Sequence, residues 1–341
     1  MEILTHVPLA PFSTFRIGGV ARYFVRVDTV ADLVEAFRFA RERSLPVFIL
    51  GGGSNVLIAD EEFKGLVIKI ELRGVSFEPE GTEVTASVAA GEPWDAFVAE
   101  TVERGLQGLE NLSGIPGSVG AVPVQNVGAY GVEVAQTIVR VEVFNPATET
   151  VALFSNAECD FGYRDSFFKT EAGRSLIITR VYFRLNPRGV VNTRYRDVQS
   201  YFARRGIECP TVKELRAAVI EIRQDKFPDL TRIGTAGSFF KNPIISAAEA
   251  AKLQEQFQGL PLFPLPDGRV KVALGWLLEQ LGWKGKCVGA VGTFDRQSLV
   301  LINVGGATAR EVREFAEAIT QDVQEKTGMV IVPEIIFAGD K

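Results

Sequence analysis

Two glycine-rich turns limit the folds that this chain can adopt. The first, Gly51-Gly52-Gly53-Ser54-Asn55, directly follows the apolar run 45–50, and the second is Gly114-Ile115-Pro116-Gly117-Ser118-Val119-Gly120. Backbone without bulky side chains lets several N–H groups converge on one anion, as a pyrophosphate requires. We therefore interpret the two turns as walls of one dinucleotide site.

Neither turn matches the common nucleotide-binding motifs. Val56 stands where Gly-x-Gly-x-x-Gly needs its last glycine, and the sequence contains no Gly-x-x-x-x-Gly-Lys. A Rossmann or P-loop interpretation is therefore excluded. Glycine clusters end strands more often than they bind cofactors, so the first turn alone predicts an ordinary turn, and the second turn shifts that balance.

Composition sets the broad class of protein. The 341 residues are 46% hydrophobic and 23% charged, which predicts a soluble globular protein of two or three domains. A net charge of −5 gives no general attraction to nucleic acid, so we expect no nucleic-acid partner. Without an apolar stretch of membrane-spanning length or a signal-peptide pattern, we expect a cytoplasmic protein with no membrane insertion.

Cysteine and histidine usage restricts the chemistry. Cys159, Cys209 and Cys287 are widely separated and odd in number, so we predict buried thiols and neither a disulfide framework nor a zinc ribbon. The single histidine, His6, excludes a His-rich metal site and argues against a Ser-His-Asp triad. We expect no bound metal, a surface position for His6, and proton transfer from another residue type.

Hydrophobic periodicity predicts α/β units followed by strands. Strand, helix and strand alternate from residue 21 to about residue 69, and a second helix follows the strand 83–89 and ends at Gly105. Between residues 138 and 185 the pattern predicts β structure. Segment 186–210 has weak periodicity and predicts an excursion loop with little core of its own.

The last third of the chain predicts a further domain. Thr211 with Glu214, and Ser246 with Glu249, fit the capping box, in which a hydroxyl and a carboxylate satisfy the free N–H groups of a helix start. A new domain is expected to begin near Thr211. Helices, a strand between them and a closing apolar strand that returns to the first domain are expected beyond it, in the order 273–281, 298–304, 309–326 and 329–337.

A few polar residues lie in apolar or glycine-bearing surroundings. One segment combines glycine, hydroxyl, aromatic and amide side chains: Gly237-Ser238-Phe239-Phe240-Lys241-Asn242-Pro243. On composition alone it predicts a turn whose aromatic rings fill the core. Arg164, Lys226 and Glu334 are equally consistent with solvated charges or ion pairs. Glu334 fits that interpretation least, because it interrupts an apolar run where a carboxylate needs a partner or a function.

The ordered motifs resemble one enzyme family. Beside the two glycine turns and the segment 237–243, they are Gln125-Asn126-Val127-Gly128-Ala129-Tyr130-Gly131 and Phe161-Gly162-Tyr163-Arg164-Asp165-Ser166. Their order and spacing resemble those of the UDP-N-acetylenolpyruvoylglucosamine reductases of peptidoglycan synthesis. The resemblance runs from Thr14-Phe15-Arg16-Ile17-Gly18 to Glu334, and the loop around Tyr195 is similar to that of the family's longer type.

The resemblance implies a three-domain α+β / α/β flavoprotein. Two domains form the FAD-binding fold of the vanillyl-alcohol-oxidase (PCMH) type, and a third α+β domain binds substrate. The expected boundaries are 1–70 for the first FAD-binding subdomain, joined by the returning strand 328–341, then 71–210 for the second and 211–327 for the substrate-binding domain. The implied cofactors are FAD and NADPH, and the implied substrate is UDP-N-acetylglucosamine enolpyruvate.

The resemblance also assigns site residues by motif. The implied catalytic residues are Arg164, Ser238 and Glu334. The implied FAD-binding residues are Gly51, Gly52, Gly53, Ser54, Asn55, Leu57, Ile115, Pro116, Gly117, Ser118, Gly120, Gln125, Asn126, Gly128, Ala129, Tyr130 and Arg223. The implied substrate-binding residues are Tyr195, Lys226, Asn242, Lys271, Lys284 and Gln297.

The chemistry of the family explains these residue types. NADPH reduces FAD, and flavin N5 then delivers a hydride to the methylene carbon of the enolpyruvyl ether. Arg164 is expected to stabilise the charge that develops on the substrate carboxylate, and Ser238 to donate the proton, assisted by Lys226 or a water. Glu334 is expected to polarise or orient the intermediate.

The sequence departs from the family pattern at four positions. Ser13 and Thr235 each replace an Asn, Phe294 stands where a His is common, and Ile336 takes the place of an Arg. Two other functions are compatible with the glycine turns, namely an FAD-dependent alcohol or sugar oxidase of the same fold and a non-catalytic flavin or nucleotide-sugar sensor. We expect a monomer.

Overall fold

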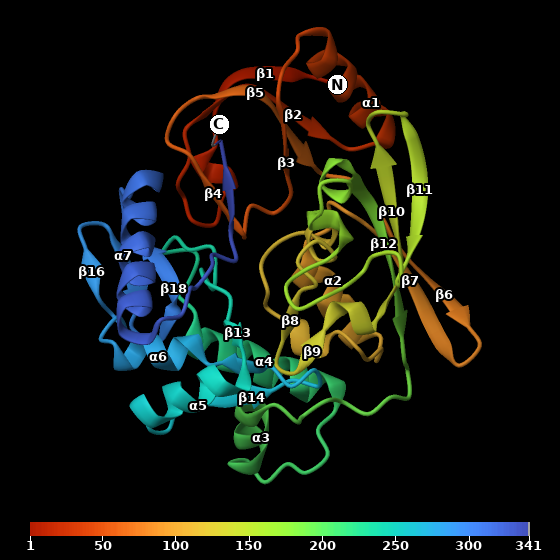
Figure 1. Ribbon diagram of the computed structural model, residues 1–341. Coiled ribbons are helices and arrows are strands. Elements are labelled where there is room, and N and C mark those ends of the chain that lie inside the picture. The colour runs from red at the N-terminus through yellow and green to blue at the C-terminus, as the bar shows by residue number, and fades with distance from the viewer. Residues whose placement is uncertain (340–341) are drawn as a thin grey trace. The chain divides into compact units, whose positions relative to one another are not determined.

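The computed structural model describes residues 1–339, which form two compact units (Figure 1). Unit 1 contains residues 1–7, 21–52 and 64–224, and unit 2 contains residues 8–20, 53–63 and the chain from residue 225 on. The α-helices are α1 (Val30–Glu42), α2 (Trp94–Glu103), α3 (Arg196–Ala203), α4 (Val212–Lys226), α5 (Ala247–Gln256), α6 (Leu274–Gln280) and α7 (Ala309–Thr327).

Strands are distributed over both units. The strands up to β10 are β1 (Ile3–Pro8), β2 (Val20–Val27), β3 (Val47–Leu50), β4 (Val56–Ile58), β5 (Phe63–Ile70), β6 (Val75–Glu80), β7 (Glu83–Ala89), β8 (Gly128–Ala129), β9 (Val132–Glu133) and β10 (Ile138–Asn145). The later strands are β11 (Thr150–Ser155), β12 (Ile177–Leu185), β13 (Ile244–Ile245), β14 (Leu262–Pro264), β15 (Val270–Val272), β16 (Cys287–Val288), β17 (Val291–Phe294), β18 (Gln297–Asn303) and β19 (Ile336–Ala338).

The first sheet of unit 1 carries the first glycine turn. Its strand order is β1-β2-β5-β3, and β3 runs parallel to β5. Helix α1 begins with a capping box in which Thr29 and Asp32 satisfy each other's backbone N–H groups. Leu33 and Ala36 of this helix are fully buried in the same core as Leu66 of β5. The predicted strand, helix and strand arrangement is therefore confirmed, and the turn 51–55 follows the end of β3.

The second sheet of unit 1 supports the second glycine turn. It is antiparallel, with strand order β11-β10-β12-β7-β6. Trp94 and Phe97 of α2 pack on Phe183 of β12, with ring centroids 5.9 and 5.2 Å from that of Phe183. Helix α2 ends just before Gly105, whose φ of 71° supplies the left-handed residue that the sequence predicted.

Segment 186–210 differs from the loop that the sequence predicted. Residues 196–203 form helix α3, whose Val198 and Phe202 are buried together with Leu215 and Val219 of α4. The prediction was wrong because only two residues of α3, Val198 and Phe202, are buried, and two apolar positions one helical turn apart give a weak periodicity. The capping box at Thr211 is confirmed, since Thr211 and Glu214 exchange hydrogen bonds at the start of α4.

Unit 2 contains two three-stranded sheets, β13-β15-β14 and β16-β17-β18, and the parallel pair β19-β4. Its core joins Phe15 and Leu57 to Phe239 and to the buried faces of α6 and α7. The capping box at Ser246 is confirmed at α5, and the helix expected over 309–326 is α7. Of the strand expected over 329–337, only its end lies in β19, and the rest of that run is irregular.

The compact units divide the chain differently from the expected three-domain plan, which stays a prediction. Helix α4, expected to open a third domain, lies with residues 64–224 in unit 1 up to Gln224. The C-terminal strand β19 pairs with β4, a strand within the first 70 residues, through Ile336 opposite Val56. The chain therefore passes between its two units several times.

The cysteine prediction is correct at only one of three positions. Cys159 is buried, but Cys209 and Cys287 are exposed, because the segments that carry them lie at the edge of their units without apolar cover. No helix among residues 1–339 is long and apolar enough to cross a membrane. Within the same residues, no group of three or more His, Cys, Asp or Glu side chains could hold a metal ion.

Glu110 is a buried carboxyl group just before the second glycine turn. Its side chain accepts a 2.7 Å hydrogen bond from the Gly108 N–H, and only 3% of the residue is exposed. Burial raises the pKa of Glu110 above its ordinary value of 4.5, although the backbone N–H groups act in the opposite direction. The folded protein therefore binds this proton more tightly than the unfolded chain.

Glu110→Gln is expected to increase the free energy of unfolding near neutral pH, because the amide needs no ionisation and still accepts from Gly108. In wild type, burying the ionised Glu110 carboxylate lowers the free energy of unfolding. This loss of stability is complete above the raised folded pKa and fades as pH falls toward 4.5, the ordinary pKa. The gain over wild type should shrink in the same range, measured by urea unfolding at several pH values. Glu35→Gln, on the exposed side of α1, is the control. Equal stability of wild type and Glu110→Gln at every pH would contradict the prediction.

Candidate functional site

The two glycine turns meet in unit 1. A Cβ atom placed on Gly52 would lie 2.5 Å from Cα of Gly117, and one on Gly51 would lie 2.7 Å from Oγ of Ser118. Real Cβ contacts are never this short, so glycine is required for the backbones to approach. Within the described residues, the N–H groups of Gly52 and Gly117 donate no hydrogen bond, which leaves them available to an anion.

Gly53 continues the first turn in unit 2. Its φ is 65°, and a Cβ there would lie 1.9 Å from the Phe12 carbonyl oxygen. The Thr14 N–H donates a 2.9 Å hydrogen bond to the Gly53 carbonyl. Conformation, close packing and a fixed carbonyl together make glycine necessary here. Leu57, the next expected cofactor residue, is fully buried in β4.

Lys69 holds the start of the first turn. From β5, its ammonium group donates a hydrogen bond to the Gly51 carbonyl. Burial lowers the pKa of Lys69, while the nearby Glu71 carboxylate acts to raise it. Sequence reasoning missed this residue, although a lysine that interrupts the apolar run of β5 was a usable signal.

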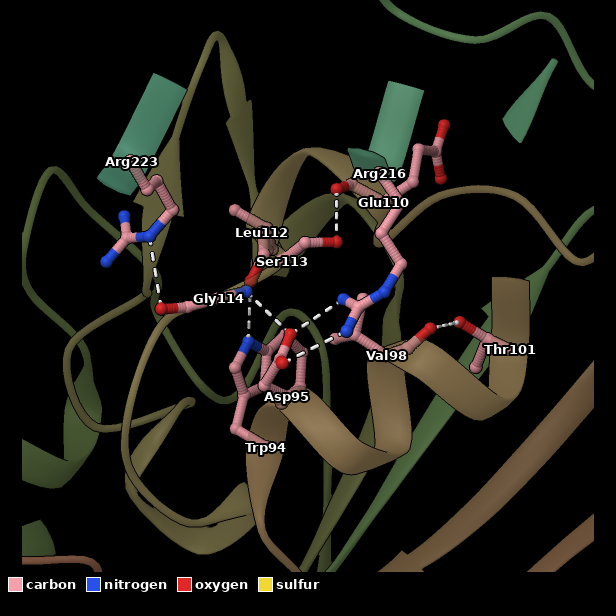
Figure 2. A network of polar contacts seen from close by, with 10 residues as sticks. All are labelled: Trp94, Asp95, Val98, Thr101, Glu110, Leu112, Ser113, Gly114, Arg216 and Arg223. Carbon is pink, nitrogen blue, oxygen red and sulfur yellow. Dashed lines mark hydrogen bonds and ion pairs between the residues drawn. The ribbon is translucent and has the colours of Figure 1, made fainter. Parts of the chain in front are cut away.

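Polar side chains hold the start of the second turn (Figure 2). The Gly114 N–H donates to Asp95 Oδ1 at 2.6 Å, and the same carboxylate pairs with both Nη atoms of Arg216 at 2.7 and 3.0 Å. Arg223 Nε donates to the Gly114 carbonyl at 3.1 Å. Burial acts to raise the pKa of Asp95, but the bonds from Arg216 and Gly114 and the charge of Arg223 hold it below its ordinary value.

The segment 125–130 and the arginine motif are also brought together in unit 1. Arg164 Nη2 donates to the Gly128 carbonyl at 2.7 Å, and the Asn126 amide donates to the Gly162 carbonyl at 2.8 Å. Asn126, Tyr130 and Arg164 have φ values of 40°, 49° and 53°, an uncommon conformation for residues with side chains. Such strained positions cluster at functional sites.

Lys169 ties the two motifs to each other. It lies at the end of the short 3-10 helix 167–169, and its ammonium group donates to the Arg164 carbonyl at 2.8 Å and to the Gln125 side-chain oxygen. Sequence reasoning missed Lys169 because it lies outside the arginine motif. Its place behind two phenylalanines was the only signal.

Tyr130 connects the cofactor-binding candidates with the tyrosine loop. Its ring is buried and meets the Tyr195 ring edge to face, with centroids 5.4 Å apart. Burial raises the pKa of Tyr130 to about 12, with the Arg223 charge acting in the opposite direction. Asn111 donates to the carbonyls of Tyr130 and Asn192, at 3.1 and 2.8 Å. Tyr195 itself is 41% exposed at the start of α3.

Unit 2 brings together the segments of Ser238 and Glu334. Ser238 forms an antiparallel bridge with Val300 of β18, and the Glu334 N–H donates to the Phe239 carbonyl at 2.7 Å. Asn55 Nδ2 donates to the Glu334 carbonyl at 3.4 Å, so the last residue of the first glycine turn belongs to the same group. Glu334 lies before β19 in an irregular segment and is half-buried.

Thr235 replaces an expected Asn and serves as a fixed support for Ser238. Its hydroxyl donates to the Leu301 carbonyl at 2.6 Å and accepts from the Gly237 N–H at 3.1 Å. Gly237, with φ of 77°, then turns the chain into Ser238. The Thr235 hydroxyl therefore has backbone partners both as donor and as acceptor, so these contacts do not require an asparagine at position 235.

The expected substrate-binding residues of unit 2 fall into different surroundings. Asn242 Oδ1 accepts a hydrogen bond from the Leu274 N–H at 3.1 Å, at the start of α6. Lys271 lies on β15 opposite Ile244, which is two residues after Asn242. Lys284 is exposed and pairs with Glu279 at 2.9 Å. Gln297 opens β18, and Lys226 ends α4. Asn242 and Lys271 are thus neighbours, whereas Lys284 already has an acidic partner.

The catalytic candidates are divided between the units. Arg164 belongs to unit 1, and Ser238 and Glu334 belong to unit 2. The remaining cofactor candidates lie in unit 1: Ile115 and Pro116 in the second turn, Gly120 in the 3-10 helix 119–121, and Ala129 in β8. Gly120 is packed against Ala90, whose Cβ would lie 2.7 Å from an added Cβ.

Two family models match this chain. Residues 21–153 match an FAD binding domain, and residues 228–338 match the C-terminal domain of UDP-N-acetylenolpyruvoylglucosamine reductase. The expected α+β / α/β class, with an FAD-binding portion before a reductase C-terminal domain, is confirmed by these matches and by the mixed sheets of both units.

Individual relatives extend the match over nearly the whole chain. The UDP-N-acetylenolpyruvoylglucosamine reductases of Chromobacterium violaceum and Pseudomonas aeruginosa are 44% and 42% identical to it, each over 98% of both chains. The crystal structure of the Thermus caldophilus UDP-N-acetylenolpyruvylglucosamine reductase is similar with a TM-score of 0.68 and 25% identity, covering 99% of this chain and 98% of that one. This chain belongs to the UDP-N-acetylenolpyruvoylglucosamine reductase family.

Proposed function

We propose that this protein is an FAD-containing oxidoreductase that reduces UDP-N-acetylglucosamine enolpyruvate to UDP-N-acetylmuramate with NADPH, in the synthesis of peptidoglycan precursors. The observation that carries the proposal is the contact of Gly52 with Gly117, in a chain whose relatives are named for this reductase. A reductase of this kind needs a dinucleotide site, a group that stabilises the negative charge on the substrate, and a group that donates one proton.

The residues of unit 1 fit FAD. A side chain on Gly52 would overlap the backbone of Gly117, and the N–H groups of Gly52 and Gly117 have no acceptor among the described residues. Such N–H groups are suited to a pyrophosphate, because they deliver hydrogen bonds without their own counter-charge. The Ser118 hydroxyl adds a polar atom beside Gly51. When bound, FAD supplies hydride transfer from NADPH to the enolpyruvyl group.

Arg164 is suited to stabilise the carboxylate of the enolpyruvyl group. Its guanidinium is oriented by the 2.7 Å bond to the Gly128 carbonyl, and its backbone carbonyl is held by Lys169. A carboxylate gains charge when the adjacent double bond is reduced, and a fixed guanidinium lowers the energy of that state. The strained φ of Arg164 fits a side chain that is held for such a purpose.

Ser238 and Glu334 are suited to handle the proton. Ser238 is half-buried, and Thr235 and β18 fix the backbone that carries its hydroxyl. We assign Ser238 as the proton donor to the carbon that bears the ether oxygen, and Glu334 as a group that orients the intermediate. A serine is a weak acid, so Lys226 or a water is expected to assist it.

The remaining assignments follow from composition and surface properties. We propose that the enzyme works in the cytoplasm as a monomer and takes the nucleotide sugar and NADPH as its small-molecule substrates. Its acidic net charge of −5 is unsuited to nucleic acid. The substrate-binding assignments of Tyr195, Lys226, Asn242, Lys271, Lys284 and Gln297 remain part of this proposal.

Anaerobic addition of NADPH is expected to bleach the bound flavin, and later addition of the enolpyruvyl substrate to restore its colour. Ser238→Ala should bleach normally but recover about 10² to 10⁴ times more slowly, because a positioned general acid has been removed. Ser238→Thr retains a hydroxyl and is the matched control for the loss of the donor. Stopped-flow absorbance follows both half-reactions. Recovery of Ser238→Ala at the wild-type rate would reject the assignment, and wild-type flavin that never bleaches with NADPH would favour a sensor.

Gly52→Ala is expected to weaken FAD binding, because the added methyl group overlaps the backbone of Gly117. Overpacking of about 1–3 kcal/mol corresponds to a range from roughly fivefold to roughly 100-fold in Kd. The measurement is quenching of flavin fluorescence by the apoprotein. Gly81→Ala is the control for a glycine-to-alanine change without overlap, since φ at Gly81 is 65° but nothing lies within 4 Å of the added carbon. Unchanged affinity in Gly52→Ala would argue against the two turns as the FAD site.

Tyr195→Phe tests the role of the exposed tyrosine. If its hydroxyl contacts the substrate pyrophosphate, the variant should show a raised KM for the nucleotide sugar, while flavin reduction by NADPH stays unchanged. The ring contact with Tyr130 is preserved in this variant, so α3 is expected to remain in place. Steady-state kinetics with both substrates provide the comparison, and an unaltered KM and turnover would show the assignment to be wrong.

A further inference from the structure

Side chains of one helix hold both the backbone N–H and the backbone carbonyl of Gly114, directly or through Asp95 (Figure 2). On the N–H side, Arg216 of α4 pairs with Asp95, whose Oδ1 accepts from the Gly114 N–H at 2.6 Å. On the carbonyl side, Arg223 of α4 donates from Nε at 3.1 Å. The two arginines are seven residues apart, so they lie on one face of the helix about two turns from each other. Helix α4 therefore constrains the two peptide groups on either side of the Gly114 Cα atom.

Glycine suits position 114 because its φ is positive and the side chains of α4 lie close to it. Its φ is 71°, and a Cβ atom there would lie 2.8 Å from Ile220 Cδ1 and 3.2 Å from Arg223 Cδ. The residue two places earlier, Leu112, accepts a 2.9 Å hydrogen bond at its carbonyl from the indole of Trp94. The turn is thus anchored from α2 before Gly114 and from α4 at Gly114 itself.

The Asp95 and Arg216 pair differs from the neighbouring ion pair between the same helices. Both Nη atoms of Arg216 bond the carboxylate, and the Arg216 side chain is only 19% exposed. Lys213 and Glu103 also join α4 to α2, at 2.6 Å, but their side chains are 58% and 69% exposed and neither contacts the glycine turn. Bidentate, partly buried pairs constrain geometry, whereas exposed pairs contribute little.

We propose that Asp95 and Arg216 are positioning residues for the flavin, acting through the peptide group between Ser113 and Gly114 to set the N–H groups of the turn 114–120. This inference rests on the proposed role of that turn in FAD binding. With the Gly114 N–H released, the peptide loses its fixed orientation and the Gly117 N–H three residues later loses its alignment. Arg223, which also bonds Gly114, would lose its fixed place beside Tyr130.

The test compares FAD affinity and flavin properties in matched variants of the full chain. Arg216→Met removes the charge and both hydrogen bonds but keeps an unbranched side chain, Asp95→Asn keeps an acceptor but loses the charge, and Arg216→Lys restores the charge without the bidentate geometry. The control is Lys213→Met on the same helix. The measurements are the Kd for FAD of each apoprotein, the visible spectrum and midpoint potential of the bound flavin, and the Tm of the apoprotein.

Arg216→Met is expected to weaken FAD binding about tenfold or more, because a charge-assisted hydrogen-bond network is lost, and to shift the flavin spectrum or potential. Arg216→Lys should recover part of the affinity, and Lys213→Met should stay within about twofold of wild type. Since Asp95 and Arg216 act as one unit, the double variant should cost no more affinity than the larger single loss.

Three results would overturn the inference. A lower Tm in Arg216→Met and Asp95→Asn, with unchanged FAD affinity, spectrum and potential, would show a merely structural pair. If Gly52→Ala weakens FAD binding and neither Arg216→Met nor Asp95→Asn does, the positioning role is wrong and the proposed function stands. If the wild-type apoprotein binds no FAD at all, the proposed function and the inference fail together.

Discussion

The contact between Gly52 and Gly117 is the constraint on which the other features of unit 1 depend. The two turns come so close that a Cβ atom on Gly52 would overlap the backbone of Gly117. Among residues 1–339, the N–H groups of Gly52 and Gly117 have no acceptor, a cost that a folded protein accepts only where a ligand or water supplies the missing partner. The sheets, with α1 and α2 packed on them, hold the two irregular turns at this distance.

Cationic side chains bonded to backbone carbonyls are the shared means of holding these irregular segments. Lys69 bonds Gly51, Arg223 bonds Gly114, Arg164 bonds Gly128, and Lys169 bonds Arg164. Glycine turns have no strand or helix ladder to satisfy their carbonyls, so charged donors take that role, and each such bond is stronger than one between neutral groups. The same cations place positive charge around turns whose proposed ligand is an anion.

Much of the fold could be predicted from sequence because it depends on local patterns. Capping boxes placed the starts of α4 and α5, and glycine with positive φ placed the end of α2. Segment 196–203 could not be predicted, since α3 gains its apolar partners from α4 rather than from its own periodicity. The same limit applies to the exposed Cys209 and Cys287, because burial of a thiol depends on which segments cover it.

The candidate site shows the same division between local and long-range information. Motifs of glycine and polar residues located the turns and Arg164, but the residues that hold them came from elsewhere in the chain. Asp95 lies 19 residues before Gly114, and Arg216 lies 121 residues after Asp95. No local pattern joins such positions, and a pairing of charges is visible only when the helices are packed. Residues that position a site are therefore harder to find from sequence than the site residues themselves, although they act on the same peptide groups.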